Sequence, residues 1–341
     1  MDAFDLDTPA LYVDLDALER NIARMQQQSR AWGVGLRPHV KTHKIPEIAQ
    51  MQLDAGAIGI TVAKLGEAEV LPGDDVLVAY PLLKPKLPRL RELAKTRALK
   101  VAVDSVDVAR DVHGEGIETL VEIDVGVGRT GAQSPEQAVE IAQACSDGNF
   151  RGICYWPSWL DEAGFQAACL KIDAVLDALS AAGFETKIVS GGSTPGAAKT
   201  PLIPRTTEIR PGTYVFYDAS SLAAKICVEA DCALRVLTTV VSTAVPGQCV
   251  IDAGSKTFSS DQTVGAGTFG HFVGRERPWT LRKLNEEHGY VEIDGPARVG
   301  EKVWVVPSHV CATVNLHDEI SYGRRGRVEG SWKVAARGRV R

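Results

Sequence analysis

Short apolar runs alternate with longer segments of helical period along the first 210 residues of the chain. Nine runs of aliphatic and aromatic residues are candidate strands, at 10–14, 35–40, 57–62, 75–80, 99–104, 119–124, 150–155, 186–191 and 207–212. Between such runs, in 15–25 and 168–179, apolar residues recur every three or four positions, which predicts helices with one apolar face. Strands and helices that alternate at this spacing predict parallel βαβ units.

The order of these elements predicts the fold class. Nine strands in one series fit a (β/α)8 barrel with one strand left over better than they fit a doubly wound sheet. From about residue 233 the pattern changes, because glycine and proline turns separate strand-like segments with little helix between them, at 233–245, 247–254, 289–295 and 300–308. We therefore expect an α/β barrel in residues 1–232 and a smaller all-β domain in residues 233–341.

Composition and charge exclude several classes of protein. The 341 residues are 45% apolar, enough for the cores of two domains, and the net charge of −5 is spread without the basic stripe that nucleic acids require. The acidic N-terminus and the lack of an apolar stretch of membrane-spanning length predict a cytoplasmic protein without a membrane partner. Seven scattered cysteines without a CxxC pair argue against a disulfide framework, and we expect most of them to be buried.

The segment LRPHVKTHK, residues 36–44, raises a chemical question. It places Lys41 between His39 and His43 where a buried strand ends, although lysine is usually exposed. In a parallel barrel, the ends of the strands and the loops after them form the site. A lysine that is partly buried there near cationic groups has a lowered pKa and can form a Schiff base with a carbonyl compound. The alternative is a loop lysine in water.

Two further strand ends carry glycines and hydroxyl groups. SGGSTPG, residues 190–196, offers backbone N–H groups that could bind a phosphate, although a Gly-Gly-Ser stretch alone also suits a tight turn. RPGTY, residues 210–214, follows the next run and adds donors from Gly212, Thr213 and the Tyr214 hydroxyl. The two segments together favour an anion site.

The loop GVGRTG, residues 126–131, follows the sixth run. Its glycines have the GxGxxG spacing, but the loop does not open a βαβ unit at the start of a nucleotide-binding domain, so we reject a dinucleotide site there. Arg129 in this loop either holds an anionic oxygen of a cofactor or substrate, or forms a surface ion pair of little energetic value.

The segment PSHVCATVNLHDE, residues 307–319, contains candidate metal ligands. In an extended segment His309 and Cys311 point to the same face, so an imidazole and a thiolate can bind one divalent ion and leave positions open for water or substrate. His317 and Asp318 are candidates to orient these ligands. The alternative is a packed strand with an ordinary histidine and a buried cysteine.

Several segments together resemble the D-threonine aldolase and D-serine dehydratase family. They are, in chain order, TPALYVDLDALERNI, LRPHVKTHK, TVAKLGEAEVL, EIDVGVGRTG, SGGSTPG, EIRPGTYVFYD, IDAGSKTFSSD, LNEEHGYVEID and PSHVCAT. Because they extend over nearly the whole chain, the resemblance is far more specific than any one motif. It implies an alanine-racemase-like fold, the cofactor pyridoxal 5'-phosphate (PLP) and a divalent metal, Zn²⁺ or Mn²⁺.

The resemblance also implies roles for particular residues. Lys41 would carry PLP, with His39 and His43 as catalytic neighbours, and His309 and Cys311 would bind the metal beside a D-amino acid substrate. The predicted cofactor-binding set comprises Lys41, Arg129, Tyr155, Ser190, Gly191, Gly192, Ser193, Gly212, Thr213 and Tyr214. The first strand is expected to join the β domain, and the protein is expected to be a homodimer.

The same residues suit two reactions of a D-β-hydroxy amino acid, in both of which PLP accepts the electron pair released at the α-carbon. Removal of the β-hydroxyl proton by a base gives glycine and an aldehyde, whereas removal of the α-proton by Lys41 and loss of the hydroxyl give a 2-oxo acid and ammonia. The segment CATVNLHDE resembles aldolase-type members, and the His-x-Cys pair resembles the dehydratase branch. We predict a D-threonine aldolase-type lyase, with a D-serine or D-3-hydroxyaspartate dehydratase as the alternative.

One departure from the family pattern concerns the base. The seventh run ends in YWPSWLD, where relatives often present a histidine, so Trp156 and Trp159 leave the base missing or supplied by His39 or His43. An amino-acid racemase is a weaker interpretation, because it needs a second base and gains nothing from a metal. A non-catalytic PLP-binding protein would lack the C-terminal β domain.

Overall fold

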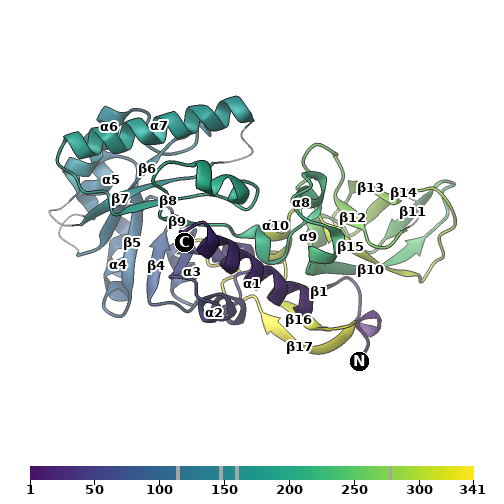
Figure 1. Cartoon of the computed structure of the whole chain (residues 1–341). Coiled ribbons are helices and arrows are strands. Elements are labelled where there is room, and N and C mark those ends of the chain that lie inside the picture. The colour runs from purple at the N-terminus through teal and green to yellow at the C-terminus, as the bar shows by residue number, and fades with distance from the viewer. Residues whose placement is uncertain (113–115, 146–148, 158–160, 276–278) are drawn as a thin grey trace. The chain divides into compact units, whose positions relative to one another are not determined.

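The computed structural model describes residues 1–112, 116–145, 149–157, 161–275 and 279–341. These residues form two compact units, whose helices and strands are labelled in Figure 1. One, the β unit, comprises Met1–Arg24, Thr42–Glu47 and Thr213–Gly338. The other, the barrel unit, comprises Met25–Lys41, Ile48–Gly212 and Arg339–Arg341.

The barrel unit is built on eight parallel strands. They are β2 (Gly35–Leu36), β3 (Ile60–Val62), β4 (Asp75–Val78), β5 (Ala98–Val103), β6 (Glu118–Ile123), β7 (Phe150–Tyr155), β8 (Ile188–Gly191) and β9 (Glu208–Ile209). Their order in the sheet is β2-β9-β8-β7-β6-β5-β4-β3, and a bridge between His39 and Thr61 joins the two edges. The sheet therefore closes into a barrel, which confirms the predicted fold class and the eight predicted strands after the first.

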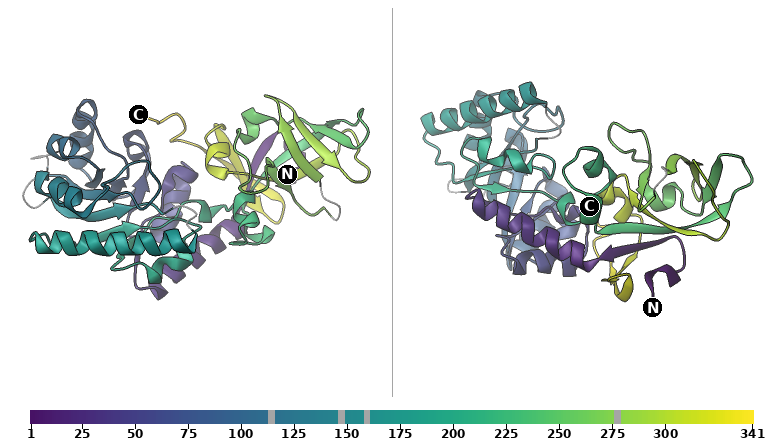
Figure 2. Two further views of the ribbon diagram at one scale, coloured as in Figure 1. Left: turned by 90° about the horizontal axis from the view of Figure 1, so that it is seen from above. Right: turned by 45° about the vertical axis from the view of Figure 1, so that its right-hand side comes forward.

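Helices alternate with these strands, as the periodicity predicts. They are α1 (Leu15–Ala31), α2 (Pro46–Asp54), α3 (Leu65–Ala68), α4 (Leu87–Ala94), α5 (Val106–Asp111), α6 (Pro135–Ala144) and α7 (Glu162–Ala181), with the 3-10 turns η2 (Val40–Thr42), η3 (Lys84–Lys86) and η4 (Ala197–Leu202). Helix α7 begins after the capping residue Asp161 and buries Ala168, Ile172 and Leu179 on one face. Helices α6 and α7 lie side by side (Figures 1 and 2).

The β unit contains a nine-stranded sheet. Its strands are β1 (Ala10–Asp14), β10 (Leu234–Ser242), β11 (Gln248–Ile251), β12 (Gly270–Phe272), β13 (Trp279–Leu284), β14 (Gly289–Ile293), β15 (Lys302–Pro307), β16 (Glu319–Arg324) and β17 (Arg327–Lys333). Its helices are η1 (Ala3–Asp5), η5 (Thr213–Val215), α8 (Ala219–Ala223), η6 (Glu229–Asp231), α9 (Ser255–Phe258) and α10 (Val310–Val314). Strand β1 is antiparallel to β10 and parallel to β16, so the first apolar run belongs to this sheet.

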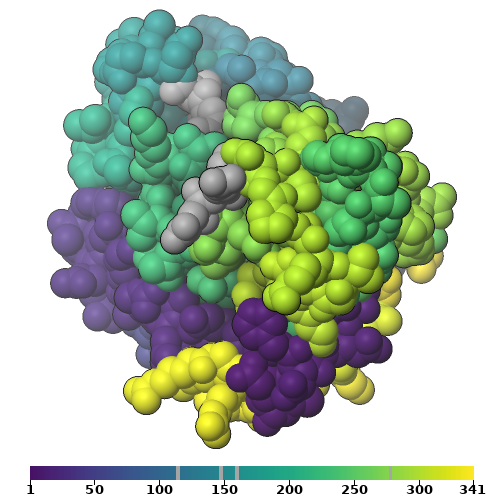
Figure 3. Space-filling model, turned by 90° about the vertical axis from the view of Figure 1, so that its right-hand side faces the viewer, coloured from purple at the N-terminus to yellow at the C-terminus, as the bar shows by residue number. Residues whose placement is uncertain are grey.

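The two units divide after Gly212, earlier than the change of sequence pattern at residue 233. The intervening segment packs within the β unit, because Ala233 N donates to the Phe216 carbonyl at 2.8 Å and Ser220 Oγ donates to the Ser308 carbonyl at 3.0 Å. The first residues of the chain are also held there, where Figure 3 shows them in purple beside yellow residues of the C-terminal strands.

All seven cysteines are free. Cys145, Cys154, Cys232 and Cys249 are buried, as expected of small apolar side chains, and the other three are half-buried. No helix in the described part of the chain has both the length and the apolar character of a transmembrane segment.

Candidate active site

The end of strand β2 encloses a neutral histidine. His39 N donates to the Pro211 carbonyl at 3.0 Å, and its backbone forms the bridge to Thr61 on β3. Burial, reinforced by the positive charges of Lys41 and Arg210, holds the pKa of His39 well below its usual value. Its Nδ1 atom is enclosed and has no hydrogen-bond partner among the described residues. The uncharged ring therefore has a nitrogen available to a ligand.

Lys41 lies on the turn η2 and is exposed, not partly buried as we expected. The other two residues of η2, Val40 and Thr42, are buried, so Lys41 is the exposed residue of this turn. His43, by contrast, is fully buried, and its Nδ1 accepts a hydrogen bond from Ile45 N at 3.1 Å. The two histidines that flank Lys41 in the sequence therefore have different environments.

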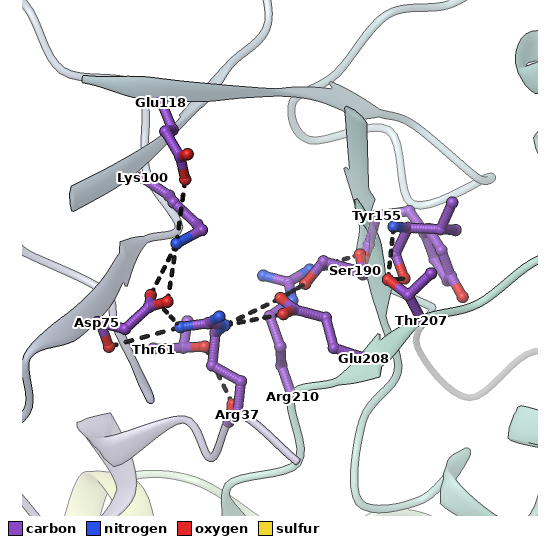
Figure 4. A network of polar contacts seen from close by, with 11 residues as sticks. Arg37, Thr61, Asp75, Lys100, Glu118, Tyr155, Ser190, Thr207, Glu208 and Arg210 are labelled. Atoms are coloured by element: carbon purple, nitrogen blue, oxygen red, sulfur yellow. Dashed lines mark hydrogen bonds and ion pairs between the residues drawn. The ribbon is translucent and has the colours of Figure 1, made fainter. Parts of the chain in front are cut away.

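Arg210 is a buried residue that the sequence analysis missed. One of its terminal nitrogens donates to the Tyr155 carbonyl at 2.7 Å and to the Ser190 carbonyl at 3.5 Å (Figure 4). Its Nε atom is enclosed and lacks a partner in the part of the chain that the structure describes. A single arginine inside the apolar run TEIRPG is the sequence signal that could have identified it. Because β2 and β9 pair, Arg210 and His39 leave two unsatisfied polar atoms after adjacent strands.

The turn after β8 admits only glycine at two positions. A Cβ atom on Gly191 would lie 2.0 Å from the Tyr155 ring, and Gly192 has a φ of +90°. Ser193 is buried, and its hydroxyl accepts a hydrogen bond from Gly196 N at 3.2 Å, which closes the turn. The segment is both a tight turn and a backbone surface without side chains, as anion binding requires.

Two hydroxyl groups of the predicted cofactor-binding residues have hydrogen-bond partners within the barrel unit. Ser190 Oγ donates to Glu208 at 2.7 Å, and the Tyr155 hydroxyl lies 2.9 Å from Thr206 Oγ1. Burial raises the pKa of Tyr155 to about 12, so its hydroxyl stays protonated at neutral pH. Contacts of these two hydroxyls with a cofactor stay predictions.

The segment RPGTY crosses the division between the units. Gly212 ends a segment of the barrel unit, whereas Thr213 and Tyr214 belong to the turn η5 of the β unit. Tyr214 is fully buried, and Thr213 Oγ1 lies 4.0 Å from Cys311 Sγ. Their contacts with a phosphate likewise stay predictions.

The glycine-rich loop after β6 folds around a carboxylate of the chain itself. Asp124 Oδ1 accepts hydrogen bonds from the N–H groups of Gly126, Val127 and Gly128 at 3.1, 2.8 and 3.0 Å. Burial raises the pKa of Asp124, but these bonds outweigh that effect and lower it. These three N–H groups of the loop are therefore occupied by a carboxylate of the chain itself.

Arg129, on the same loop, is largely exposed. Its guanidinium lies 4.9 Å from the centroid of the Trp156 ring, a cation–π contact, and 3.9 Å from Glu122 Oε1. Glu122 is buried, and its Oε1 atom accepts a hydrogen bond from the Thr130 hydroxyl at 2.8 Å. Arg129 therefore keeps a charge that a ligand could use, while Trp159 lies outside the described residues.

His309 and Cys311 lie together, but on a helix and not on the extended strand that we predicted. His309 is the N-cap of α10, and Cys311 lies in its first turn. A hydrogen bond joins the imidazole to the sulfur and is the main cause that raises the pKa of His309 to about 10, against the opposite effect of burial. Asp218 accepts from Val310 N and thereby fixes the start of the helix.

The groups that we expected to orient this pair lie elsewhere. His317 Nε2 is 3.1 Å from the Thr257 carbonyl, and Asp318 pairs with Arg337. No three His, Cys, Asp or Glu side chains form a metal-binding cluster within the described ranges. The His-x-Cys pair would therefore bind an ion with positions left for water or substrate.

The residues at the strand ends fit PLP. The turn after β8 offers a backbone surface to its phosphate, and the enclosed Nε of Arg210 requires a polar partner that its ring can supply. Lys41 supplies an amine on the turn that follows His39. The donor set at α10, one imidazole nitrogen and one sulfur, suits Zn²⁺ better than hard cations.

The fold and these residues define a PLP-dependent enzyme with the alanine-racemase architecture. The family model described as "Alanine racemase, N-terminal domain" matches residues 13–220, and the one described as "Putative serine dehydratase domain" matches residues 233–322. The chain belongs to the PLP-dependent family of D-threonine aldolases, 3-hydroxy-D-aspartate aldolases and D-serine dehydratases. The resemblance seen in the sequence is confirmed.

Named relatives include both an aldolase and a dehydratase. The 3-hydroxy-D-aspartate aldolase of Paracoccus denitrificans (strain Pd 1222) is 35% identical over 99% of this chain and 94% of its own length. The D-threo-3-hydroxyaspartate dehydratase of Delftia sp. (strain HT23) is 36% identical over 90% of this chain and 92% of its own length.

Solved structures of D-threo-3-hydroxyaspartate dehydratase variants share the fold of the whole chain. A histidine-to-alanine variant has a TM-score of 0.90 and 32% identity, covering 98% of this chain and 96% of that one. A cysteine-to-alanine variant in the metal-free form has a TM-score of 0.89 and 33% identity, covering 98% of each chain. The two replaced residues are two positions apart, as His309 and Cys311 are here.

Proposed function

We propose that this protein is a PLP- and divalent-metal-dependent lyase of the D-threonine aldolase type, which cleaves a D-β-hydroxy amino acid to glycine and an aldehyde. The observation that carries the proposal is a pair of enclosed nitrogen atoms without hydrogen-bond partners, His39 Nδ1 and Arg210 Nε. These two residues follow the paired strands β2 and β9, and His39 lies just before the turn that bears Lys41.

Residues of the barrel unit would hold the cofactor. Lys41 would bind PLP through its side-chain amine, and the backbone of Gly191 and Gly192 would bind the phosphate. Arg210 is always charged, and its unpaired Nε would donate to the cofactor ring. When bound, PLP supplies an electron sink for the pair released at the substrate α-carbon.

His39 is the base that we assign to the β-hydroxyl proton. Its lowered pKa keeps the ring neutral near pH 7, the state in which an imidazole accepts a proton. His43 is less suited, because its Nδ1 already accepts from Ile45 N. Trp156, which stands where relatives often present a histidine, has an N–H donor but no acceptor for a proton.

His309 and Cys311 are the metal ligands that we propose. Their spacing equals that of the histidine and cysteine replaced in the dehydratase variants, and the structure of the cysteine variant is described as the metal-free form. The ion, when bound, supplies Lewis-acid polarisation of the substrate hydroxyl. This spacing also favours a second candidate function, dehydration of D-3-hydroxyaspartate to a 2-oxo acid and ammonia.

Product analysis decides between the two reactions. Purified protein with PLP and Mn²⁺ or Zn²⁺ is incubated with D-threonine, D-serine or D-3-hydroxyaspartate, and glycine, aldehyde, 2-oxo acid and ammonia are all assayed. Glycine with an equal amount of aldehyde is the expected result, whereas a 2-oxo acid with ammonia would overturn the aldolase assignment. The matched control is Lys41→Ala, which should lose both the products and the visible absorbance of bound PLP.

We also propose that the protein is a homodimer in the cytoplasm. The family resemblance supports the dimer, and the cytoplasmic location is carried over as an expectation from the sequence. Analytical ultracentrifugation of the PLP-loaded protein tests the first point, and fractionation of cells that express it tests the second. A monomer at micromolar concentration would contradict the dimer.

A further inference from the structure

Two histidines of the β unit each contact a carboxylate, but through different ring nitrogens. His309 Nδ1 lies 2.7 Å from Asp261 Oδ2, and His271 Nε2 lies 2.7 Å from Glu229 Oε2. The side-chain exposures of the two pairs are similar, 45% and 47% for the first and 47% and 39% for the second. The two pairs therefore differ mainly in which nitrogen is left for another ligand.

In the pair of His309 and Asp261, the ring nitrogen that does not contact the carboxylate is Nε2, and this imidazole also lies beside a sulfur atom. Asp261 contacts Nδ1 of His309, so Nε2 is the ring nitrogen that can bind a metal ion, which displaces the proton from it. The same imidazole contacts Cys311. In the second pair, Glu229 occupies Nε2 of His271, the ring atom farther from the backbone.

The segment that bears Asp261 is fixed to the helix that bears His309. Asp261 N donates to Ser259 Oγ at 3.2 Å, just after helix α9. Thr313 Oγ1, on helix α10, donates to the Phe258 carbonyl at 2.9 Å. These contacts hold the carboxylate and the imidazole on neighbouring helical ends before any ligand binds.

We propose that Asp261 is a positioning residue of the metal site: it fixes the His309 ring so that Nε2 is the atom that binds the divalent ion. This inference rests on the proposed function, because it assumes that His309 and Cys311 bind the metal. A carboxylate that accepts from the second nitrogen of a metal-binding imidazole sets the tautomer and orientation of the ring and raises its basicity. Asp261 acts through the imidazole and is not itself a ligand.

Metal affinity measures this role directly. PLP-loaded wild type, Asp261→Ala, Asp261→Asn and Glu229→Ala are titrated with Zn²⁺ in competition with a chelator. Asp261→Ala is expected to raise the dissociation constant about 10- to 100-fold. Asp261→Asn should have a smaller effect, because its amide oxygen still accepts from Nδ1–H, and Glu229→Ala, which removes the matched pair at His271, should have none.

The results that would overturn the inference are distinct from failure of the proposed function. An unchanged dissociation constant in Asp261→Ala would exclude the positioning role, and a complete loss of binding, as expected for His309→Ala, would make Asp261 a ligand. If Asp261→Ala does not fold, Asp261→Asn decides in the same way. No Zn²⁺ binding by wild type would instead refute the proposed metal site.

Substitution of Co²⁺ for Zn²⁺ distinguishes an effect on the orientation of the His309 ring from a general disturbance of the metal site. With Co²⁺ in the same variants, the thiolate-to-cobalt absorption band should persist at saturating metal in Asp261→Ala, because Cys311 still binds. Loss of that band, or of the visible absorbance of PLP, would show that the substitution disturbs more than the His309 ring and would overturn the inference.

Discussion

Ionisable groups of the barrel unit differ in their pairing near the two ends of its strands. Near the amino ends, where Asp75 begins β4, Glu118 begins β6 and Glu208 begins β9, every one of these carboxylates has a cationic partner (Figure 4). After the carboxyl ends, His39 Nδ1 and Arg210 Nε have no partner in the described ranges. Removal of one partner from such an ion pair is costly to stability, whereas an ionisable group that leaves a buried nitrogen unpaired is a candidate contact for a ligand.

The network near the amino ends joins strands that are distant in sequence. Arg37 Nε donates to both oxygens of Glu208 at 3.0 Å, and its NH1 donates to Asp75 at 2.6 Å. Lys100 Nζ lies 2.9 Å from Asp75 and 3.2 Å from Glu118. Burial alone would raise the pKa of Asp75, but the two cations outweigh it and lower the pKa. The charges are thus mutually compensated.

Glu208→Ala should have the largest effect on stability. It leaves the buried Arg37 with Asp75 alone, and loss of one partner of a buried ion pair costs about 3–5 kcal/mol of unfolding free energy. Chemical denaturation of the PLP-free protein measures this change. As a control, Asp177→Ala removes an exposed partner of Arg205 and should cost less than about 1 kcal/mol. Equal, small losses in both variants would refute the stabilising role of the network.

Arg210→Gln should affect the cofactor more than the fold. A hydrogen bond from a charged donor contributes about 1.5–3 kcal/mol, so its loss should weaken PLP binding about 10- to 100-fold. The stability of the PLP-free protein should fall less than in Glu208→Ala, because the described hydrogen bonds of Arg210 go to backbone carbonyls and not to a carboxylate. Titration with PLP, followed by absorbance, measures the affinity. Unchanged affinity with a large loss of stability would place Arg210 in the structural network instead.

The strands of the barrel could be predicted because their signal is local. Each of the nine apolar runs overlaps a strand, although β2 and β9 are much shorter than their runs, since a short run of aliphatic residues between turns is visible in the sequence itself. The ion pair of Arg37 and Glu208 could not be predicted, because it joins residues 171 positions apart whose pairing depends on closure of the barrel. The lack of a partner at Arg210 Nε is likewise a property of the folded chain alone.

The metal segment shows where local signals mislead. VCATV is rich in β-branched residues and predicts a strand, yet it forms helix α10. Contacts from distant segments decide this, because Asp218 accepts from Val310 N and Thr313 Oγ1 donates to the Phe258 carbonyl. The spacing of His309 and Cys311 predicted that these two side chains lie together. The contact of Asp261 with His309 could not be predicted, because the two residues are 48 positions apart.

His39 provides the smallest predicted effect, a pH dependence. In the folded PLP-free protein, burial and the charges of Lys41 and Arg210 hold its pKa well below 6.5. As the pH falls below about 6.5, the unfolded chain binds a proton that the folded protein excludes. The free energy of unfolding should therefore fall in this range, by at most about 1.4 kcal/mol per pH unit, and should not depend on His39 at higher pH.

The variant His39→Asn isolates this contribution. Denaturation at about pH 7.5 and about pH 5.5 should show that wild type loses more stability than the variant, because asparagine does not titrate. The paired end of the barrel should not contribute in this range, since the pKa of Asp75 is lowered from 3.8 and its stabilisation is lost only at lower pH. Parallel losses in the two proteins would mean that the folded protein binds the proton at His39 as readily as the unfolded chain does. The enclosed nitrogen would then be no evidence for a ligand site.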